Sequence, residues 1–257
     1  MDGATAAEPA AGAESATLNL VPGTHAVQLR AAFEDGTTSE SPVFTVVADT
    51  TRPVLSSQSL TLRKATVNAT AYPVQLGWKA GDNTLLSSLK ATSPSAQTFA
   101  TTATTWPATA KALATQSWSL TAEDAAGNST TGAISRYAGG FSDGSAVRTG
   151  TWKTVTSTSY LGGRGLYTTA RGASASWTFT GTSVGLVFTR AAKYGAVYIY
   201  SDGVKVATLD TRATSTAYRQ LLWTRNWTTS AKHTIKIVVA GTSGRPTVAT
   251  DGLVYIR

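Results

Sequence analysis

Apolar and polar residues alternate along most of this chain, and this pattern limits what the chain can fold into. Between residues 25 and 33, His25, Val27, Leu29, Ala31 and Phe33 fall on one face of an extended segment. A two-residue period places neighbouring side chains on opposite faces of a strand, so such a segment covers a core on one side only. No segment shows a convincing 3.6-residue apolar period. We therefore expect an all-β fold built of tandem β-sandwiches.

The composition agrees with strands and turns. Hydrophobic residues make up 42% of the chain but charged residues only 14%, against about 25% in ordinary domains. Thr, Ser, Ala and Gly fill the difference, and these residues suit pleated surfaces and turns. The absence of Cys removes disulfides and thiolate metal sites. There is no run of about 18 apolar residues, which predicts that the chain has no membrane span.

A strand, a polar turn and a returning strand recur in three segments, 25–47, 117–137 and 232–256, and each is interpreted as the closing hairpin of a sandwich. The pair Asp202-Gly203 joins two further alternating segments and is the clearest hairpin signal in the chain. The chain begins without the basic and apolar regions of a signal peptide, so its first residues are interpreted as a flexible linker.

Two breaks in the pattern predict domain boundaries. Polar residues followed by Pro53 end the first module, and a Gly-rich stretch at 136–146 ends the second. Residues 1–50 contain too few strands for a sandwich and are expected to be the C-terminal part of a repeat. Residues 51–139 are expected to form one complete sandwich and residues 140–257 a jelly roll of about eight strands.

The net charge of +8 is distributed unevenly. Residues 1–50 carry one basic and seven acidic residues, for a net charge of −6. Residues 51–139 carry seven basic and three acidic residues (+4), and residues 140–257 carry fourteen basic and four acidic residues (+10). The C-terminal part therefore carries the positive field and favours acidic partners. Its basic residues are spread singly and match no nucleic-acid motif, so no specific nucleic-acid partner is expected.

Residues 48–135 contain the run "DTTRPVL…VQLGWKAGDN…WSLTAEDAAGNST". This run resembles the Ig-like or fibronectin type III-like repeats of large secreted bacterial proteins, which open with Asp-Thr-x-x-Pro and close with Ala-x-Asp-x-x-Gly-Asn-x-Ser. The resemblance implies that residues 51–139 form an Ig-like β-sandwich, and the alternating strand pattern itself places Trp78 and Trp118 in its core. It also implies that residues 1–50 are the end of a preceding repeat.

Residues 150–257 combine "GTWKTVTS", "WTFTGTSVGLVF", "VYIYSDGVKVATLD", "YRQLLWTRNW", "KHTIKIVVAGT" and "TDGLVYI". In this order the motifs resemble the galactose-binding-like jelly rolls of actinobacterial-type secreted proteins. Gly252 departs from the family, where an Ala is usual. Because relatives of this family include carbohydrate-binding modules, the resemblance implies glycan binding and a secreted or cell-surface location.

Two G-x-S-x-G motifs surround Ser142 and Ser183, and Asp202 and His233 follow them in the order of an α/β-hydrolase triad. A nucleophile elbow needs a strand before the Ser and a helix after it. Ser142 lies in a Gly-rich junction and Ser183 precedes a strand, so both matches are attributed to chance. His25 and His233 begin equivalent core strands and are interpreted as hydrogen-bond donors that cap them. No catalytic residue is assigned, and the chain is expected not to be an enzyme.

The acidic pairs Glu34-Asp35 and Glu123-Asp124 occupy the same place in two repeats. Neighbouring strand residues point to opposite faces and make a poor acid–base pair, so both pairs are interpreted as turn elements. Calcium is the one cofactor left open, because Asp82, Asp124 and Asn128 could converge in space. No metal site is assigned, since the ligands do not alternate along one loop as in a strong calcium site.

Aromatic residues are the main indication of a binding function in the C-terminal domain. The apolar face of a sugar ring stacks on flat aromatic side chains, and polar groups at the rim fix its orientation. We predict a carbohydrate site from Trp152, Tyr160, Tyr218, Arg219, Trp223 and Trp227. The opposing interpretation, that Trp223 is core and the Arg side chains are solvated, stays open because both faces of "YRQLLWTRNW" mix polar and apolar groups.

The sequence therefore predicts a non-catalytic extracellular region in which Ig-like spacers present a jelly roll that binds a polysaccharide, with acidic glycans favoured by charge. One alternative is a purely structural stalk or adhesin segment that contacts protein partners. Another is an accessory region of a larger secreted hydrolase.

Overall fold

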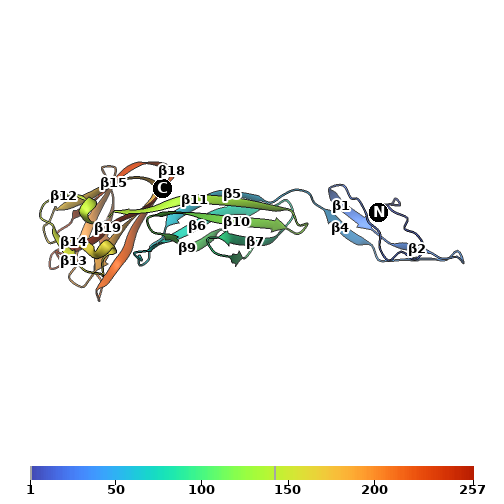
Figure 1. Cartoon of the computed structure of the whole chain (residues 1–257), viewed down its shortest axis with the longest axis horizontal. Helices are drawn as coiled ribbons and strands as arrows, with labels where there is room; N and C mark the ends of the chain where they lie inside the picture. The colour runs from blue at the N-terminus through green and yellow to red at the C-terminus, as the bar shows by residue number, and fades with distance from the viewer. Residues whose placement is uncertain (1, 142) are drawn as a thin grey trace.

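The computed structural model describes residues 2–141 and 143–257, and nearly all regular structure in this range is β-strand. This confirms the prediction of an all-β fold. The molecule is elongated, with a C-terminal sandwich at one end, a second sandwich in the middle and the N-terminal strands at the other end (Figure 1). Within the described residues, no helix has the length and apolar character needed to cross a membrane.

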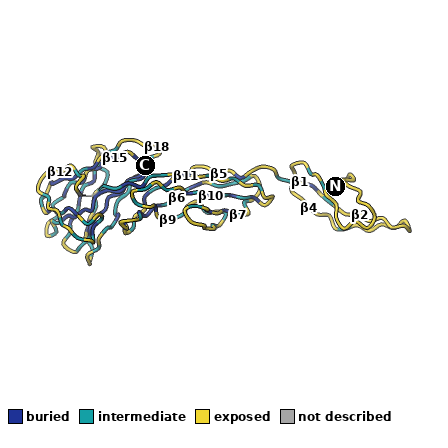
Figure 2. The backbone as a smooth tube through the Cα atoms, viewed as in Figure 1, coloured by how far each residue is buried: buried dark blue, intermediate teal, exposed yellow. Residues whose placement is uncertain are grey.

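The N-terminal strands form two hairpins that lack a packed core. β1 (Gly23–Val27) pairs with β4 (Phe44–Ala48), and β2 (Arg30–Ala32) pairs with β3 (Thr38–Glu40). Among the described residues up to 50, His25 alone is buried, and Figure 2 shows most of this region as exposed. Exposed apolar side chains include Val21, Leu29, Phe33, Val43 and Phe44. That these hairpins end a larger repeat stays a prediction.

The middle sandwich packs a three-stranded sheet against a four-stranded one. The first sheet has the order β5 (Val54–Leu62), β6 (Ala71–Gly81) and β9 (Thr105–Lys111). The second has the order β11 (Ser129–Phe141), β10 (Ala114–Asp124), β7 (Leu86–Ser93) and β8 (Gln97–Phe99). Trp78 and Trp118 are 3% and 1% exposed and lie in one core, as the alternation predicted.

The C-terminal sandwich is built around two long antiparallel strands, β15 (Ser174–Arg190) and β18 (Ala217–Val239). One half of this pair is flanked by β12 (Val147–Thr149) and by β16 (Ala196–Ser201) with β17 (Val204–Asp210). The other half is flanked by β19 (Val248–Ile256), to which β14 (Arg164–Thr168) and β13 (Lys153–Thr156) add. The C-terminal sandwich also contains two short 3-10 helices, η1 (Asp143–Ser145) and η2 (Leu161–Gly163).

The apolar–polar alternation of the sequence predicts separate strands at 175–180 and 184–190, and again at 218–225 and 234–239. The structure instead continues both strands through a register shift between Gly181 and Ser183. A Cβ on Gly181 would lie 2.3 Å from the carbonyl oxygen of Ile256. A glycine in a strand interior permits this close backbone approach at an irregular point of the ladder.

The two sandwiches share a strand and part of a core. β11 pairs with β10 along residues 129–138 and with β19 along residues 138–141, so one sheet runs through both sandwiches. The expected boundary at 139/140 therefore falls inside this strand. Val187, Leu221 and Ile256 of the C-terminal sandwich belong to the same buried cluster as Leu60 and Trp118 of the middle one.

Candidate functional site

Three of the predicted site residues meet at one end of β18. The rings of Tyr160 and Tyr218 pack edge to face, with their centroids 5.4 Å apart. Tyr160 is 6% exposed and Tyr218 39% exposed. The Arg219 guanidinium donates hydrogen bonds to the carbonyl oxygens of Ser159 (2.9 Å) and Thr158. Arg219 thus anchors the loop that carries Tyr160, and Tyr218 alone presents substantial surface.

A buried carboxyl group that the sequence analysis did not select lies beneath this loop. Asp251 on β19 is fully buried, and one of its oxygens accepts the backbone N–H of Arg219 at 3.2 Å. The other oxygen, Oδ1, has no hydrogen-bond partner. Burial raises the pKa of Asp251 to about 7, against the opposing effects of the Arg219 N–H and the Arg219 charge.

Two of the predicted tryptophans serve packing. The Trp152 indole donates to the carbonyl oxygens of Thr149 (3.2 Å) and Ser174 (3.0 Å), and its ring packs partly buried against the C-terminal core. Trp223 packs partly buried against the same core. The structure therefore does not bring the six predicted residues together at one place on the surface.

Trp227 lines a groove between the two sandwiches. The groove has a volume of about 590 Å³, and β5 of the middle sandwich forms one wall through residues 57–61. The other wall is formed by Thr182, Asn226, Trp227 and Thr228, and Arg136 of β11 also lines it. The lining therefore combines one indole, several hydroxyl and amide groups and one guanidinium, without a carboxylate.

The C-terminal core holds the Trp227 indole in place. Its ring stacks on His233 with a centroid separation of 3.8 Å and an interplanar angle of 14°. The Arg225 guanidinium lies 5.4 Å from the centroid of the Trp227 ring. His233 covers one face of the indole, so that face is closed to a sugar ring.

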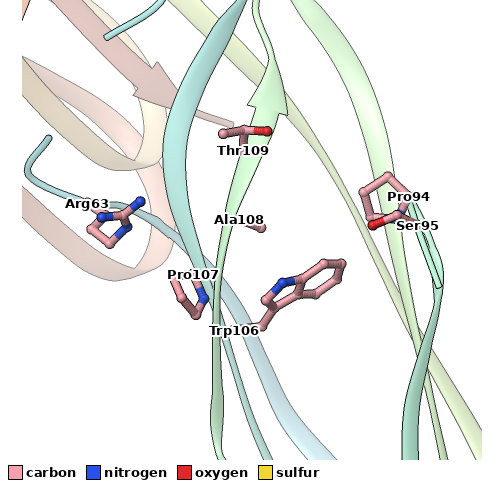
Figure 3. A pocket seen from close by; sticks show the side chains of 7 residues that line it. All are labelled: Arg63, Pro94, Ser95, Trp106, Pro107, Ala108 and Thr109. Carbon is pink, nitrogen blue, oxygen red and sulfur yellow. The ribbon is translucent and has the colours of Figure 1, made fainter. Parts of the chain in front are cut away.

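A second hollow, of about 330 Å³, lies on the middle sandwich at the edge strand β9. Figure 3 shows the Trp106 indole between β9 and the turn that carries Pro94 and Ser95. Arg63 and Pro107 line the same hollow. The sequence analysis selected none of these residues, because it treated the middle sandwich as a spacer.

Both histidines take the capping role expected from the sequence. His233 Nδ1 lies 2.9 Å from Asp202 Oδ2, and the N–H of Thr234 donates to Asp202 Oδ1 at 2.8 Å. His25 repeats the arrangement with Asp2 at 2.7 Å. The His25–Asp2 hydrogen bond is the largest cause that raises the pKa of His25 and lowers that of Asp2.

The structure brings no nucleophile to these histidines within the described residues. The buried Ser183 hydroxyl donates to Asn226 Oδ1 at 2.6 Å and accepts the N–H of Leu62 at 2.9 Å. It therefore fixes the contact between the two sandwiches and does not bond to His233. Ser142, the centre of the other G-x-S-x-G motif, lies outside the described residues.

Three carboxylates meet where the N-terminal hairpins join the middle sandwich. Each of Asp49, Asp82 and Asp124 places one oxygen within 4.8 Å of the others. Asp124 is buried and accepts the N–H groups of Ala126 and Asn128 as well as the Asn128 amide. Asn128 therefore supports the cluster with its N–H groups and does not contribute the oxygen ligand that the calcium hypothesis gave it.

We expect Asp82→Asn to stabilise the protein in EDTA by about 0.5–1 kcal/mol. Like charges at short range repel one another, and Asp82 Oδ1 is buried without a donor, a position that an amide N–H₂ group could use. Thermal unfolding of wild type and variant, with EDTA and with millimolar calcium, measures the effect. A wild-type melting temperature that rises with calcium, and a variant that loses this rise, would contradict the expected absence of a cofactor.

No family model matches the chain. A stretch of 114 residues is 32% identical to the A type blood N-acetyl-alpha-D-galactosamine deacetylase of Flavonifractor plautii, over 44% of this chain and 14% of the deacetylase. The chain therefore spans a small part of that relative's length.

Solved structures that match about half of this chain include two carbohydrate-binding modules. One is the CBM36-1 domain of a multidomain xylanase from the hindgut metagenome of Trinervitermes trinervoides, with 18% identity, 48% of this chain and 96% of that chain covered, and a TM-score of 0.34. The other is the family 35 carbohydrate-binding module of Clostridium thermocellum, with 15% identity, 46% and 96% coverage and a TM-score of 0.34.

Proposed function

We propose that this chain is a non-catalytic, extracellular region of a larger carbohydrate-active protein and binds an acidic polysaccharide. The groove that holds Trp227 carries the proposal. An indole offers a flat apolar surface for a sugar ring, and the surrounding hydroxyl and amide groups offer hydrogen bonds at its rim. The likeness of a 114-residue stretch to part of a glycan deacetylase supports a role beside carbohydrate chemistry.

The charge of the groove supports an acidic ligand. Arg136 is the one titratable group among the lining residues, and its guanidinium suits a planar carboxylate. Hydrolysis of a glycosidic bond commonly uses two carboxyl groups that flank the bond, and no carboxylate lines this groove. The chemistry of the lining therefore favours binding over catalysis.

We expect Trp227→Ala to abolish retention of the whole chain in affinity electrophoresis through polygalacturonate, because it removes the flat surface. Arg136→Gln should weaken retention, and Arg148→Gln, which removes an exposed charge elsewhere, should leave it unchanged. Because Trp227 packs on His233, circular dichroism must show that the variant is folded.

Neutral galactan serves as the comparison ligand in the same electrophoresis. Wild-type retention by neither polysaccharide would overturn the proposed function. Retention by galactan alone would overturn the acidic ligand class. Equal losses in Arg136→Gln and Arg148→Gln would show that net charge, and not the groove, causes the binding.

A further inference from the structure

Strand β5 is irregular where it forms a wall of the groove that Trp227 lines. Ser57 and Gln58 of β5 lie opposite Trp78 of β6 alone, and the register of the two strands shifts at this point. Two residues opposite one form a β-bulge. Ser57 has a φ of 54°, a left-handed conformation that is unfavourable for a residue with a Cβ. Bulges change the direction of side chains and are frequent beside functional sites.

The hydrophobic pattern of β5 explains why the bulge forms. Leu55 and Leu60 both pack against the core of the middle sandwich. They are an odd number of positions apart, so an uninterrupted strand would point them to opposite faces of the sheet. The extra residue of the bulge brings both onto the core face. The bulge is therefore built into the sequence, and it fixes the position of Gln58 at the groove.

The Gln58 side chain reaches from one sheet of the middle sandwich to the other. β5 and β11 lie side by side (Figure 1). A Cβ on Gly132 of β11 would lie 2.5 Å from Gln58 Nε2 and 3.2 Å from Gln58 Cδ, so the amide occupies the space that a side chain at 132 would take. Gln58 is half-buried and lines the groove. Among the described residues, its amide group has no hydrogen-bond partner.

Gln58 and Arg136 offer the groove two different kinds of polar contact. The Arg136 guanidinium donates to the carbonyl oxygen of the adjacent Ser135 at 2.9 Å, and its other N–H groups suit a carboxylate. The Gln58 amide carries an acceptor oxygen and a donor N–H₂ group in one plane. It can therefore accept a hydrogen bond from one sugar hydroxyl and donate one to the adjacent hydroxyl.

We infer that Gln58 is a specificity-determining residue of the groove, and that its amide binds two adjacent free hydroxyl groups of a uronic acid polymer held by Trp227 and Arg136. The inference rests on the proposed function and deepens it. It narrows the ligand to an acidic polysaccharide whose adjacent ring hydroxyls carry no substituent. Gly132 is a positioning residue, because the missing side chain leaves the space that the Gln58 amide occupies.

Modified ligands test the two polar contacts separately. Isothermal titration of the whole chain uses galacturonate oligomers, whose internal units carry two adjacent hydroxyl groups. Gln58→Ala should lower the affinity about tenfold, as expected for the loss of two hydrogen bonds. O-acetylation of the oligomers should weaken binding to wild type by the same factor and leave binding to Gln58→Ala unchanged. Methyl esterification removes the charge that Arg136 binds and should weaken binding to both proteins alike.

A second variant displaces the amide without removing it. Gly132→Ala places its Cβ against the flexible end of Gln58, so the amide must move away and the affinity should fall about tenfold. In a Gln58→Ala background, Gly132→Ala should cause no further loss. Losses that add in the double variant would contradict the positioning role of Gly132.

Matched controls separate these effects from general damage to the fold. Gly81→Ala on β6 adds a Cβ with no heavy atom within 4 Å, and Gln97→Ala removes an exposed amide from the distant edge strand β8. Both variants should bind as wild type does. Thermal unfolding of all the variants shows that they are folded under the conditions of the titration.

The results distinguish this inference from the proposed function. Wild type that binds unmodified and O-acetylated oligomers equally well, with Gln58→Ala equal to wild type, would overturn the role of Gln58 and leave the acidic ligand standing. Wild type that binds no galacturonate oligomer would overturn the acidic ligand class, and this inference with it.

Discussion

Asp251→Asn should stabilise the protein by up to about 4 kcal/mol at pH 8 and leave its stability nearly unchanged at pH 4. Asp251 is fully buried and its pKa is raised from 3.8 to about 7, a shift of about 3 pKa units at 1.36 kcal/mol each. An asparagine keeps an oxygen acceptor for the Arg219 N–H but carries no charge to desolvate. Urea unfolding at several pH values measures the difference.

The direction of the pH dependence follows from the raised pKa. Between about pH 4 and pH 7 the folded protein holds the Asp251 proton and the unfolded chain does not, so the free energy of unfolding falls as the pH rises. The stabilising contribution is complete below pH 4 and lost above pH 7. The variant should lack this part of the pH dependence.

Asp210→Asn provides a control of opposite sign in the same domain. Arg245 binds the Asp210 carboxylate through two hydrogen bonds of 2.8 and 2.9 Å, and this interaction lowers the pKa of Asp210. Its replacement should therefore reduce stability at neutral pH and have less effect as the pH falls through the folded pKa. An Asp251→Asn variant that is less stable than wild type at pH 8 would show that the carboxylate is paired when charged.

Leu221→Ala should destabilise both sandwiches together, by about 2–5 kcal/mol as for other large-to-small core substitutions. Leu221 lies on β18 of the C-terminal sandwich, but it is 1% exposed and belongs to the core cluster of the middle one. Because β11 also pairs with strands of both sandwiches, we expect residues 54–257 to unfold in one cooperative transition. Differential scanning calorimetry measures the number of transitions and their midpoints.

Two matched substitutions locate the coupling. Leu89→Ala removes a fully buried side chain of the middle sandwich, and Val239→Ala removes one from the C-terminal core. If the sandwiches form one cooperative unit, each of the three variants lowers the same single transition. Separate transitions, of which Leu89→Ala shifts only one, would contradict this expectation.

The alternation of side chains was sufficient to predict the strands and several hairpins, because burial on one face is a local property of each strand. It correctly placed Trp78 and Trp118 in a core and Asp202-Gly203 in a turn between β16 and β17. The continuous strand β15 and the double pairing of β11 were not predicted. Both depend on how closely distant backbones approach, as Gly181 does to Ile256.

The candidate site could be predicted only in part for the same reason. Trp227 was selected for its chemistry, but β5, which forms the other wall of its groove, belongs to a different sandwich. Both faces of β18 mix polar and apolar side chains, so periodicity could not separate Trp227, which lines the groove, from Trp223, which does not.

The shared strand β11 also sets the mechanics of the molecule. A continuous sheet cannot bend sharply between the two sandwiches without breaking the β11–β10 or β11–β19 ladder. We therefore expect the two sandwiches to move as one rigid body, to which the amide of Asn128 and the hydroxyl of Thr84 tie the incoming chain at Asp49.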